Sequence, residues 1–141
     1  MTMRTLVIAL LLAQIPAPVA ASDSAPGTSL RNLCSAESGR RDGREERRFE
    51  CSLAPELASQ RFRFAVTFSG SHDDTTLAMT ATLNGSPIAC DEGSKLESEG
   101  EFGDIVLHCR FGLRPGAGTQ RLRVIVAWFH ADLSEHQLVP D

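Results

Sequence analysis

The sequence predicts an all-β domain in which two antiparallel sheets pack as a sandwich of immunoglobulin-like architecture, with six to eight strands and two disulfides. From Arg47 onward, apolar and polar residues alternate with a period of two, as they do in half-buried strands. Gly, Pro and Asn separate the alternating runs, and no run has a convincing helical stripe. The four cysteines are an even set, as expected for a small exported domain. A small β-barrel is the alternative architecture.

Only the architecture is immunoglobulin-like. True immunoglobulin domains have a tryptophan between two cysteines and a tyrosine close to the second cysteine. This chain contains no tyrosine, and its one tryptophan, Trp128, follows the last cysteine. The sequence therefore predicts a sandwich without indicating membership of that family.

Residues 1–21 have the three parts of a cleavable secretory signal. Arg4 supplies the positive charge, residues 6–13 form an unbroken apolar run, and Val19-Ala20-Ala21 places small residues before the cut. A membrane anchor would need roughly 20 apolar residues, and this run is much shorter. We therefore expect an exported protein, periplasmic or secreted, with no membrane span in its mature form.

Residues 22–46 are poor in apolar side chains and rich in Ser, Gly, Asp and Arg. This composition is typical of a flexible arm, so the sandwich domain is expected over residues 47–141. The arginines between Arg40 and Glu50 are nearly balanced by carboxylates, and the whole chain has a net charge of -4. Nucleic-acid binding depends on uncompensated positive charge, so we expect no nucleic-acid partner.

Three hairpins follow from the alternating pattern. Asn84-Gly85 is a strong signal for a type I′ hairpin turn, because both residues tolerate a positive φ. The other two hairpins join runs that are neighbours along the chain, across Pro55–Gln60 and Arg114–Gln120. The registers that match apolar with apolar residues pair Ala81 with Ile88, Cys51 with Phe64, and Cys109 with Val126.

The cysteines are expected to form disulfides. Four thiolates could instead bind zinc, but such sites usually have paired C-x-x-C spacing, and here the intervals are wide and unpaired. Three pairings of four cysteines are possible. We favour Cys34–Cys51 with Cys90–Cys109, because each of these bridges closes a shorter loop.

The segment Val124–Phe129 is apolar on both faces. A sheet face that meets water normally alternates apolar with polar residues, so the outward face of this strand must be covered. Terminal segments of this chain could cover it, or a protein partner or second copy could, since exposed apolar patches mark interaction sites. With the expected hairpin, this surface consists of Val106, His108, Arg110, Arg123, Ile125, Ala127 and Phe129.

The preferred function is therefore an exported, non-enzymatic binding or accessory domain that engages another protein or a second copy through this face, without a cofactor. One alternative is a small metal-handling protein that binds copper or zinc through His108, His130 and His136, because imidazole is a ligand for both metals. A hydrolase is the third hypothesis. The chain has no G-x-S-x-G motif, and we predict no catalytic residues.

Overall fold

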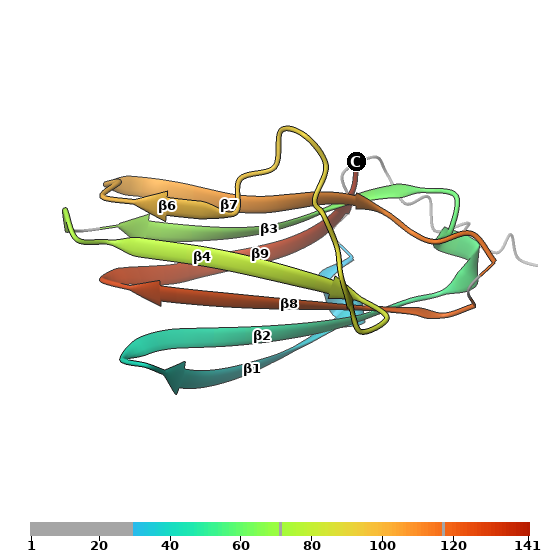
Figure 1. Cartoon of the computed structure of the whole chain (residues 1–141), viewed down its shortest axis with the longest axis horizontal. Helices are drawn as coiled ribbons and strands as arrows, with labels where there is room; N and C mark the ends of the chain where they lie inside the picture. Colours follow the sequence, from blue (N-terminus) through green and yellow to red (C-terminus); the bar gives the residue numbers. More distant parts are fainter. Residues whose placement is uncertain (1–29, 71, 117) are drawn as a thin grey trace, which may run out of the picture.

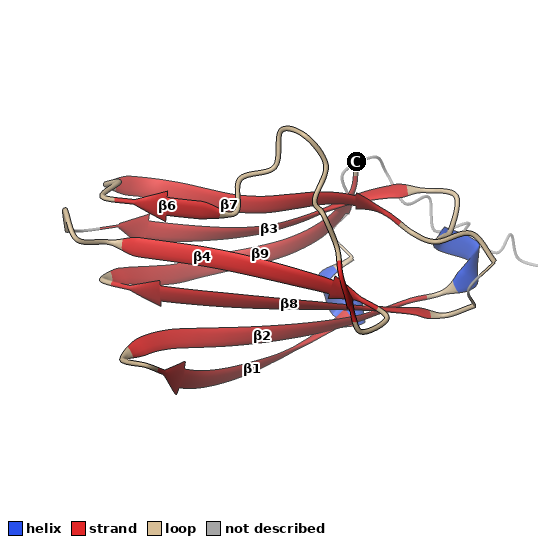
Figure 2. Ribbon diagram, viewed as in Figure 1, coloured by secondary structure: helices blue, strands red, loops and turns tan. Residues whose placement is uncertain are grey.

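The computed structural model describes residues 30–70, 72–116 and 118–141. Within these ranges, nine strands form two antiparallel sheets that pack face to face (Figures 1 and 2). The predicted sandwich is confirmed, with nine strands in the described ranges where six to eight were expected, and the alternative of a closed barrel is wrong. The expected signal segment, residues 1–21, lies outside the described residues. In the described part of the chain, no helix is long and apolar enough to cross a membrane.

The larger sheet has six strands and the smaller sheet has three. The order in the larger sheet is β1 (Cys34–Arg41), β2 (Arg44–Leu53), β8 (Gln120–Phe129), β4 (Thr76–Leu83) and β5 (Ser86–Pro87), and β6 (Glu97–Glu99) also pairs with β4. The order in the smaller sheet is β7 (Gly103–Gly112), β3 (Arg61–Gly70) and β9 (Ala131–Pro140). Single helical turns precede β1 and β3, at Arg31–Leu33 and Pro55–Leu57.

Strand β1 lies where the sequence predicted a flexible arm. A tight turn at Asp42-Gly43, with φ angles of 52° and 78°, folds β1 back onto β2. Cys34 is directly opposite Cys51 in this pair, and a disulfide joins them. The side chains of β1 are almost all exposed, so this strand lacks the apolar alternation by which strands are recognised. Backbone pairing and the disulfide order it instead.

Two of the three predicted hairpins are wrong. β2 and β3 belong to different sheets, and so do β7 and β8. Cys51 therefore lies opposite Leu122 of β8, and Phe64 lies opposite Cys109 of β7. A period of two shows which side chains of a strand point inward. The pattern is the same whether two consecutive strands pair with each other or lie in different sheets, so it does not identify the neighbour.

The third hairpin is confirmed at its turn. Asn84 and Gly85 have φ angles of 52° and 83°, as a type I′ turn requires. β4 and β5 pair over two residues, and the amide of Ile88 donates to the carbonyl of Ala81 at 3.1 Å. Beyond this point the chain crosses to the smaller sheet, where Cys90 is bonded to Cys109 of β7.

The core lies between the two sheets. Phe49 of β2 packs on Phe64 of β3 with 5.2 Å between ring centroids, and Phe68 packs on Trp128 at the same distance. The inward positions that the alternation predicted in β2, β3, β4, β7 and β8 are buried, while Ile88 beyond β5 is half-buried. The fully buried side chains include Phe49, Phe62, Phe64, Phe68, Leu107, Leu122, Val124 and Val126.

Candidate functional site

The seven residues predicted to form one binding face lie on opposite sides of the sandwich. Because β7 and β8 belong to different sheets, their outward side chains point away from each other, with the core between them. The smaller sheet carries Val106, His108 and Arg110, and the larger sheet carries Arg123, Ile125, Ala127 and Phe129.

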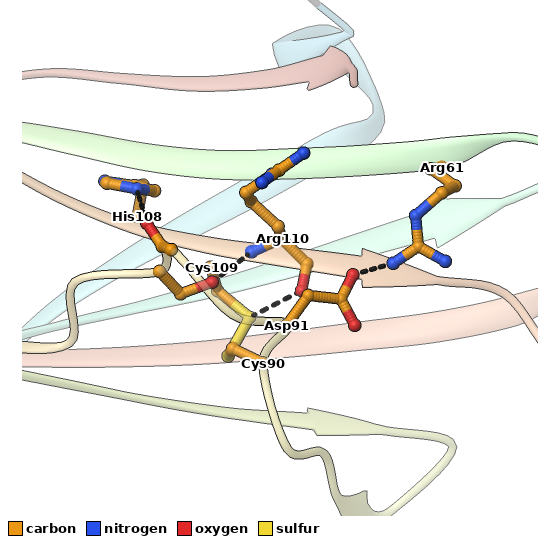
Figure 3. The surroundings of a disulfide bond; sticks show 8 residues. Arg61, Cys90, Asp91, His108, Cys109 and Arg110 are labelled. Atoms are coloured by element: carbon orange, nitrogen blue, oxygen red, sulfur yellow. Dashed lines mark hydrogen bonds and ion pairs between the residues drawn. A yellow bond between two sulfur atoms is a disulfide. The ribbon is translucent and has the colours of Figure 1, made fainter.

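The edge of the smaller sheet is covered by a loop of the same chain. Residues 88–96 leave the larger sheet after β5 and rise past β7 before β6 rejoins the larger sheet (Figure 1). Lys95 and His108 exchange backbone hydrogen bonds of 2.9 and 2.8 Å, and the amide of Asp91 donates to the carbonyl of Arg110 at 2.7 Å. The disulfide Cys90–Cys109 ties this loop to β7 (Figure 3).

The polar side chains on β7 are engaged by the same loop and by the C-terminal residue. The Nε2 atom of His108 lies 2.8 Å from the carbonyl oxygen of Gly93. The Nε atom of Arg110 donates to Asp141 at 2.6 Å, and its backbone amide donates to Ser94 Oγ at 2.9 Å. These contacts hold His108 and Arg110 against other segments of the same chain.

The outer face of the larger sheet carries an apolar strip along β8. Ile125, Ala127 and Phe129 follow one another on this face; the first two are half-buried and Phe129 is 40% exposed. Ala78 of the neighbouring strand β4 lies directly opposite Ala127 and widens the strip. We call Ile125, Ala127 and Phe129 the β8 strip.

An ion pair between β2 and β8 lies at one end of the β8 strip. Glu50 and Arg123 are directly opposite in the two strands, and Nε of Arg123 donates to the Glu50 carboxylate at 2.9 Å. This hydrogen bond, and then the positive charge of Arg123, hold the pKa of Glu50 below its ordinary value of 4.5. The pair fixes the direction of the Arg123 guanidinium beside the strip.

A second ion pair lies next to the middle of the β8 strip. Glu46 faces Ala127 on one side and Gly39 on the other, and it is only 6% exposed. The Nε atom of Arg48 donates to Glu46 at 2.9 Å, while the Arg48 side chain remains half exposed. The strip is therefore bordered by two arginines, each held in place by a carboxylate.

Shallow hollows lie along this face. A hollow of about 590 Å³ at the Arg123 end is lined by Thr82, Asn84 and Ile125, among others. Another of about 360 Å³ lies at the opposite end, beside Ala78 and Thr76. A third, of about 290 Å³, is lined by both bordering arginines and by Glu50. The surface is therefore uneven but open, with an apolar centre and a charged border.

The structure does not bring together the three histidines proposed as metal ligands. His108 contacts the loop beside β7, as described above. His136 points into the sandwich, and its ring packs on Phe49 with 4.6 Å between centroids. His130 is the single residue between β8 and β9, in a left-handed conformation with φ of 51°.

His130 instead meets two residues that sequence analysis did not group with it. Ligand atoms of His72, Asp74 and His130 all lie within 4.8 Å of one another, and all three side chains are exposed. The Nδ1 atom of His130 is 2.6 Å from Asp74 Oδ1, and this hydrogen bond is the main reason that the pKa of Asp74 is lowered. Finding this cluster required the pairing of β3 with β9 and of β4 with β8, neither of which the alternation indicates.

No protein-family model matches the chain, and no curated protein matches it. Among solved structures, the chain is similar to one described as TmCBM61 in complex with β-1,4-galactotriose. The TM-score is 0.40 with 11% sequence identity, over 82% of this chain and 87% of that chain. A similarity this distant assigns the chain to no family.

Proposed function

We propose that the protein is an exported, non-enzymatic binding domain that engages a protein partner through the outer face of its larger sheet. The observation that carries this proposal is the β8 strip, an apolar row bordered by Arg123 and Arg48. The part of the originally predicted face on β7 does not contribute. There, His108 binds the loop that follows β5 and Arg110 binds the C-terminal Asp141.

The composition of this face favours a protein over a small ligand. Protein interfaces are enriched in aromatic residues and arginine around an apolar centre, and Phe129, Ile125 and Arg123 supply these groups. Small-molecule sites are instead concave and enclose most of their ligand. The hollows beside the strip are shallow and open, so they suit protrusions of a partner surface better than an enclosed ligand.

The proposed mechanism is burial of the strip with the arginines setting orientation. Covering apolar surface contributes roughly 25 cal/mol per Å², and this term does not depend on direction. Arg123 and Arg48 are already held by Glu50 and Glu46, so little side-chain entropy is lost when a partner contacts them. Export fits the two disulfides, which persist in oxidising compartments.

The test compares two exposed apolar residues on opposite sheets. Phe129 is 40% exposed and Val106 is 39% exposed, so Phe129→Asp and Val106→Asp introduce the same charge at equally accessible positions. The full chain is expressed in an oxidising compartment so that its disulfides form. The purified protein is then used to capture partners from the cell envelope of its own organism. The captured protein is then purified and titrated against each variant by calorimetry.

We expect Phe129→Asp to weaken binding at least thirtyfold, the size of a central aromatic contact, and Val106→Asp to leave binding unchanged. Near-ultraviolet circular dichroism, which reports on the packing of Trp128, checks that both variants are folded. An equal loss of partner affinity in both variants, or a loss in Val106→Asp alone, would show that the partner does not bind the outer face of the larger sheet. Unfolding of Phe129→Asp would show that this ring belongs to the core; Ile125→Asp then tests the same face.

A further inference from the structure

We propose that His72, Asp74 and His130 form a binding site for a divalent transition-metal ion, with zinc as the best-fitting metal. The site goes beyond the proposed protein-binding function and does not depend on it. It also differs from the trio suggested by the sequence, of which only His130 takes part.

The registers of both sheets place the three residues at one end of the sandwich. In the larger sheet, Thr76 pairs with Phe129, and in the smaller sheet Gly70 pairs with Ala131. The connection between β3 and β4 and the turn at His130 therefore pass from sheet to sheet side by side. His72 and Asp74 lie in the first connection, so the ligands come from two segments that the strand pairing holds together.

A buried hydroxyl fixes the backbone of both segments. Thr75 is fully buried, and its Oγ1 donates to the carbonyl oxygen of His130 at 2.7 Å. Thr75 Oγ1 also accepts a hydrogen bond from the backbone amide of His72 at 3.3 Å. The backbones of the two histidines are thus linked through a buried hydroxyl that is not one of the three metal-binding groups, which is the kind of support that orients metal ligands.

The side chains are close to ligand geometry. A tetrahedral zinc ion with bonds of about 2.0–2.2 Å keeps its ligand atoms roughly 3.4 Å apart. The three ligand atoms here lie within 4.8 Å, with rings of His72 and His130 4.8 Å apart between centroids. Small rotations of exposed side chains close this difference. A metal ion would then take the place of the contact between His130 Nδ1 and Asp74 Oδ1, which lie 2.6 Å apart.

The ligand set indicates the class of metal. Two imidazoles and one carboxylate suit zinc, which commonly takes three protein ligands and leaves a fourth position open. Calcium and magnesium prefer oxygen ligands alone, so the two histidines disfavour them. His130 also stacks on Phe129, with 3.9 Å between ring centroids, so the site adjoins the end of the β8 strip.

The test is a titration of the purified, oxidised full chain with zinc chloride at neutral pH, followed by calorimetry and native mass spectrometry. We expect one zinc ion per chain, and at least tenfold weaker binding in each of His72→Ala, Asp74→Asn and His130→Ala. Asp73→Asn is the matched control, because Asp73 is the exposed neighbour outside the cluster. His108→Ala is the second control, since this histidine lies on β7.

Both controls are expected to bind zinc like the wild-type chain, and circular dichroism checks that every variant is folded. The proposal is overturned if the wild-type chain shows no saturable binding at one equivalent. It is equally overturned if His130→Ala binds zinc with unchanged affinity, or if Asp73→Asn and Asp74→Asn lose affinity to the same extent. Because the readout is zinc binding, it is independent of whether the β8 strip captures a protein.

Discussion

The smaller sheet has a loop that connects two strands of the larger sheet bonded along the edge of β7, whereas the larger sheet presents the β8 strip and its arginines in the open. On the smaller sheet, His108 and Arg110 contact Gly93 and Asp141. On the larger sheet, Arg123 and Arg48 are paired with carboxylates of the same face. The inner faces of both sheets, by contrast, contribute equally apolar side chains to one core.

This difference shows that a connection between strands of the larger sheet covers the edge of the smaller one. The segment between β5 and β6 both starts and ends in the larger sheet, yet it crosses to β7, where Cys90 is bonded to Cys109. An unpaired edge of a sheet invites association with other chains, and this loop protects the edge of β7. β8 needs no such protection, because its backbone is paired on both sides, with β2 and with β4.

The largest expected effect comes from removing the disulfide that holds this loop. Replacing both Cys90 and Cys109 by Ser should lower the free energy of unfolding by about 2–4 kcal/mol and expose the β7 edge. Hydrogen exchange should become faster at the amides of Lys95 and His108, each of which donates to the carbonyl oxygen of the other residue. Calorimetric or denaturant unfolding gives the first quantity, and exchange followed by NMR gives the second.

The other disulfide is a matched control. Cys34 and Cys51 are 17 residues apart and Cys90 and Cys109 are 19 apart, so both bridges restrict the unfolded chain to a similar extent. Replacing Cys34 and Cys51 by Ser should cost a similar stability while leaving the loop on β7 protected. If the loop amides stay protected without Cys90–Cys109, the disulfide does not hold the loop and the comparison between the sheets fails.

A smaller effect is expected from the buried carboxylate beside the β8 strip. Replacing Arg48 by Ala leaves Glu46, whose side chain is 7% exposed, without this hydrogen-bond donor. The expected loss of unfolding free energy is about 1–3 kcal/mol, the cost of an unsatisfied buried polar group. Denaturant unfolding at neutral pH measures it.

Arg40→Ala provides the control for this prediction. The Arg40–Glu45 pair joins side chains that are 72% and 50% exposed, and exposed pairs contribute about 0–1 kcal/mol. Equal losses of unfolding free energy in Arg48→Ala and Arg40→Ala would mean that water satisfies Glu46. The Arg48–Glu46 pair would then not hold Arg48 in place beside the strip.

The smallest effect concerns the ion pair at the Arg123 end of the strip. Replacing Arg123 by Gln should raise the pKa of Glu50 toward its ordinary value of 4.5, because the hydrogen bond and the nearby charge that lower this pKa are removed. Arg121→Gln should change it less, since the charge of Arg121 is the weakest of the causes. Carbon chemical shifts of the Glu50 carboxyl, followed during acid titration, measure both. Equal shifts in the two variants would show that Arg123 is not fixed by this pair.

The sign of the pH dependence follows from the same pair. A carboxyl whose pKa is lowered by folding stabilises the folded state above its ordinary pKa and loses this contribution as the pH falls through the lowered value. Wild-type protein should therefore exceed Glu50→Gln in stability at neutral pH and converge with it in acid.

Much of the candidate surface could be predicted from the sequence, but not which strands lie next to one another. The apolar outward positions of β8 were visible because Val124–Phe129 has no polar residue on either face. Their grouping with Val106 was wrong, because it assumed that β7 and β8 pair. Strand β1 was missed for a different reason, because its exposed side chains give no alternation. It is ordered instead by the turn at Asp42-Gly43, by backbone pairing with β2 and by the disulfide of Cys34. The cluster around His130 depends on two pairings between strands distant in sequence.

The sequence alone determined which side chains point inward and where Asn84-Gly85 turns the chain, and it favoured the cysteine pairing that the structure shows. These are local properties of a strand or turn, or follow from short separations along the chain. The tertiary structure alone decided which strands are neighbours, because the backbone groups that pair strands are the same in nearly every residue and do not identify a partner. That choice placed the β8 strip on one face, Val106 on the other, and His72 and Asp74 beside His130.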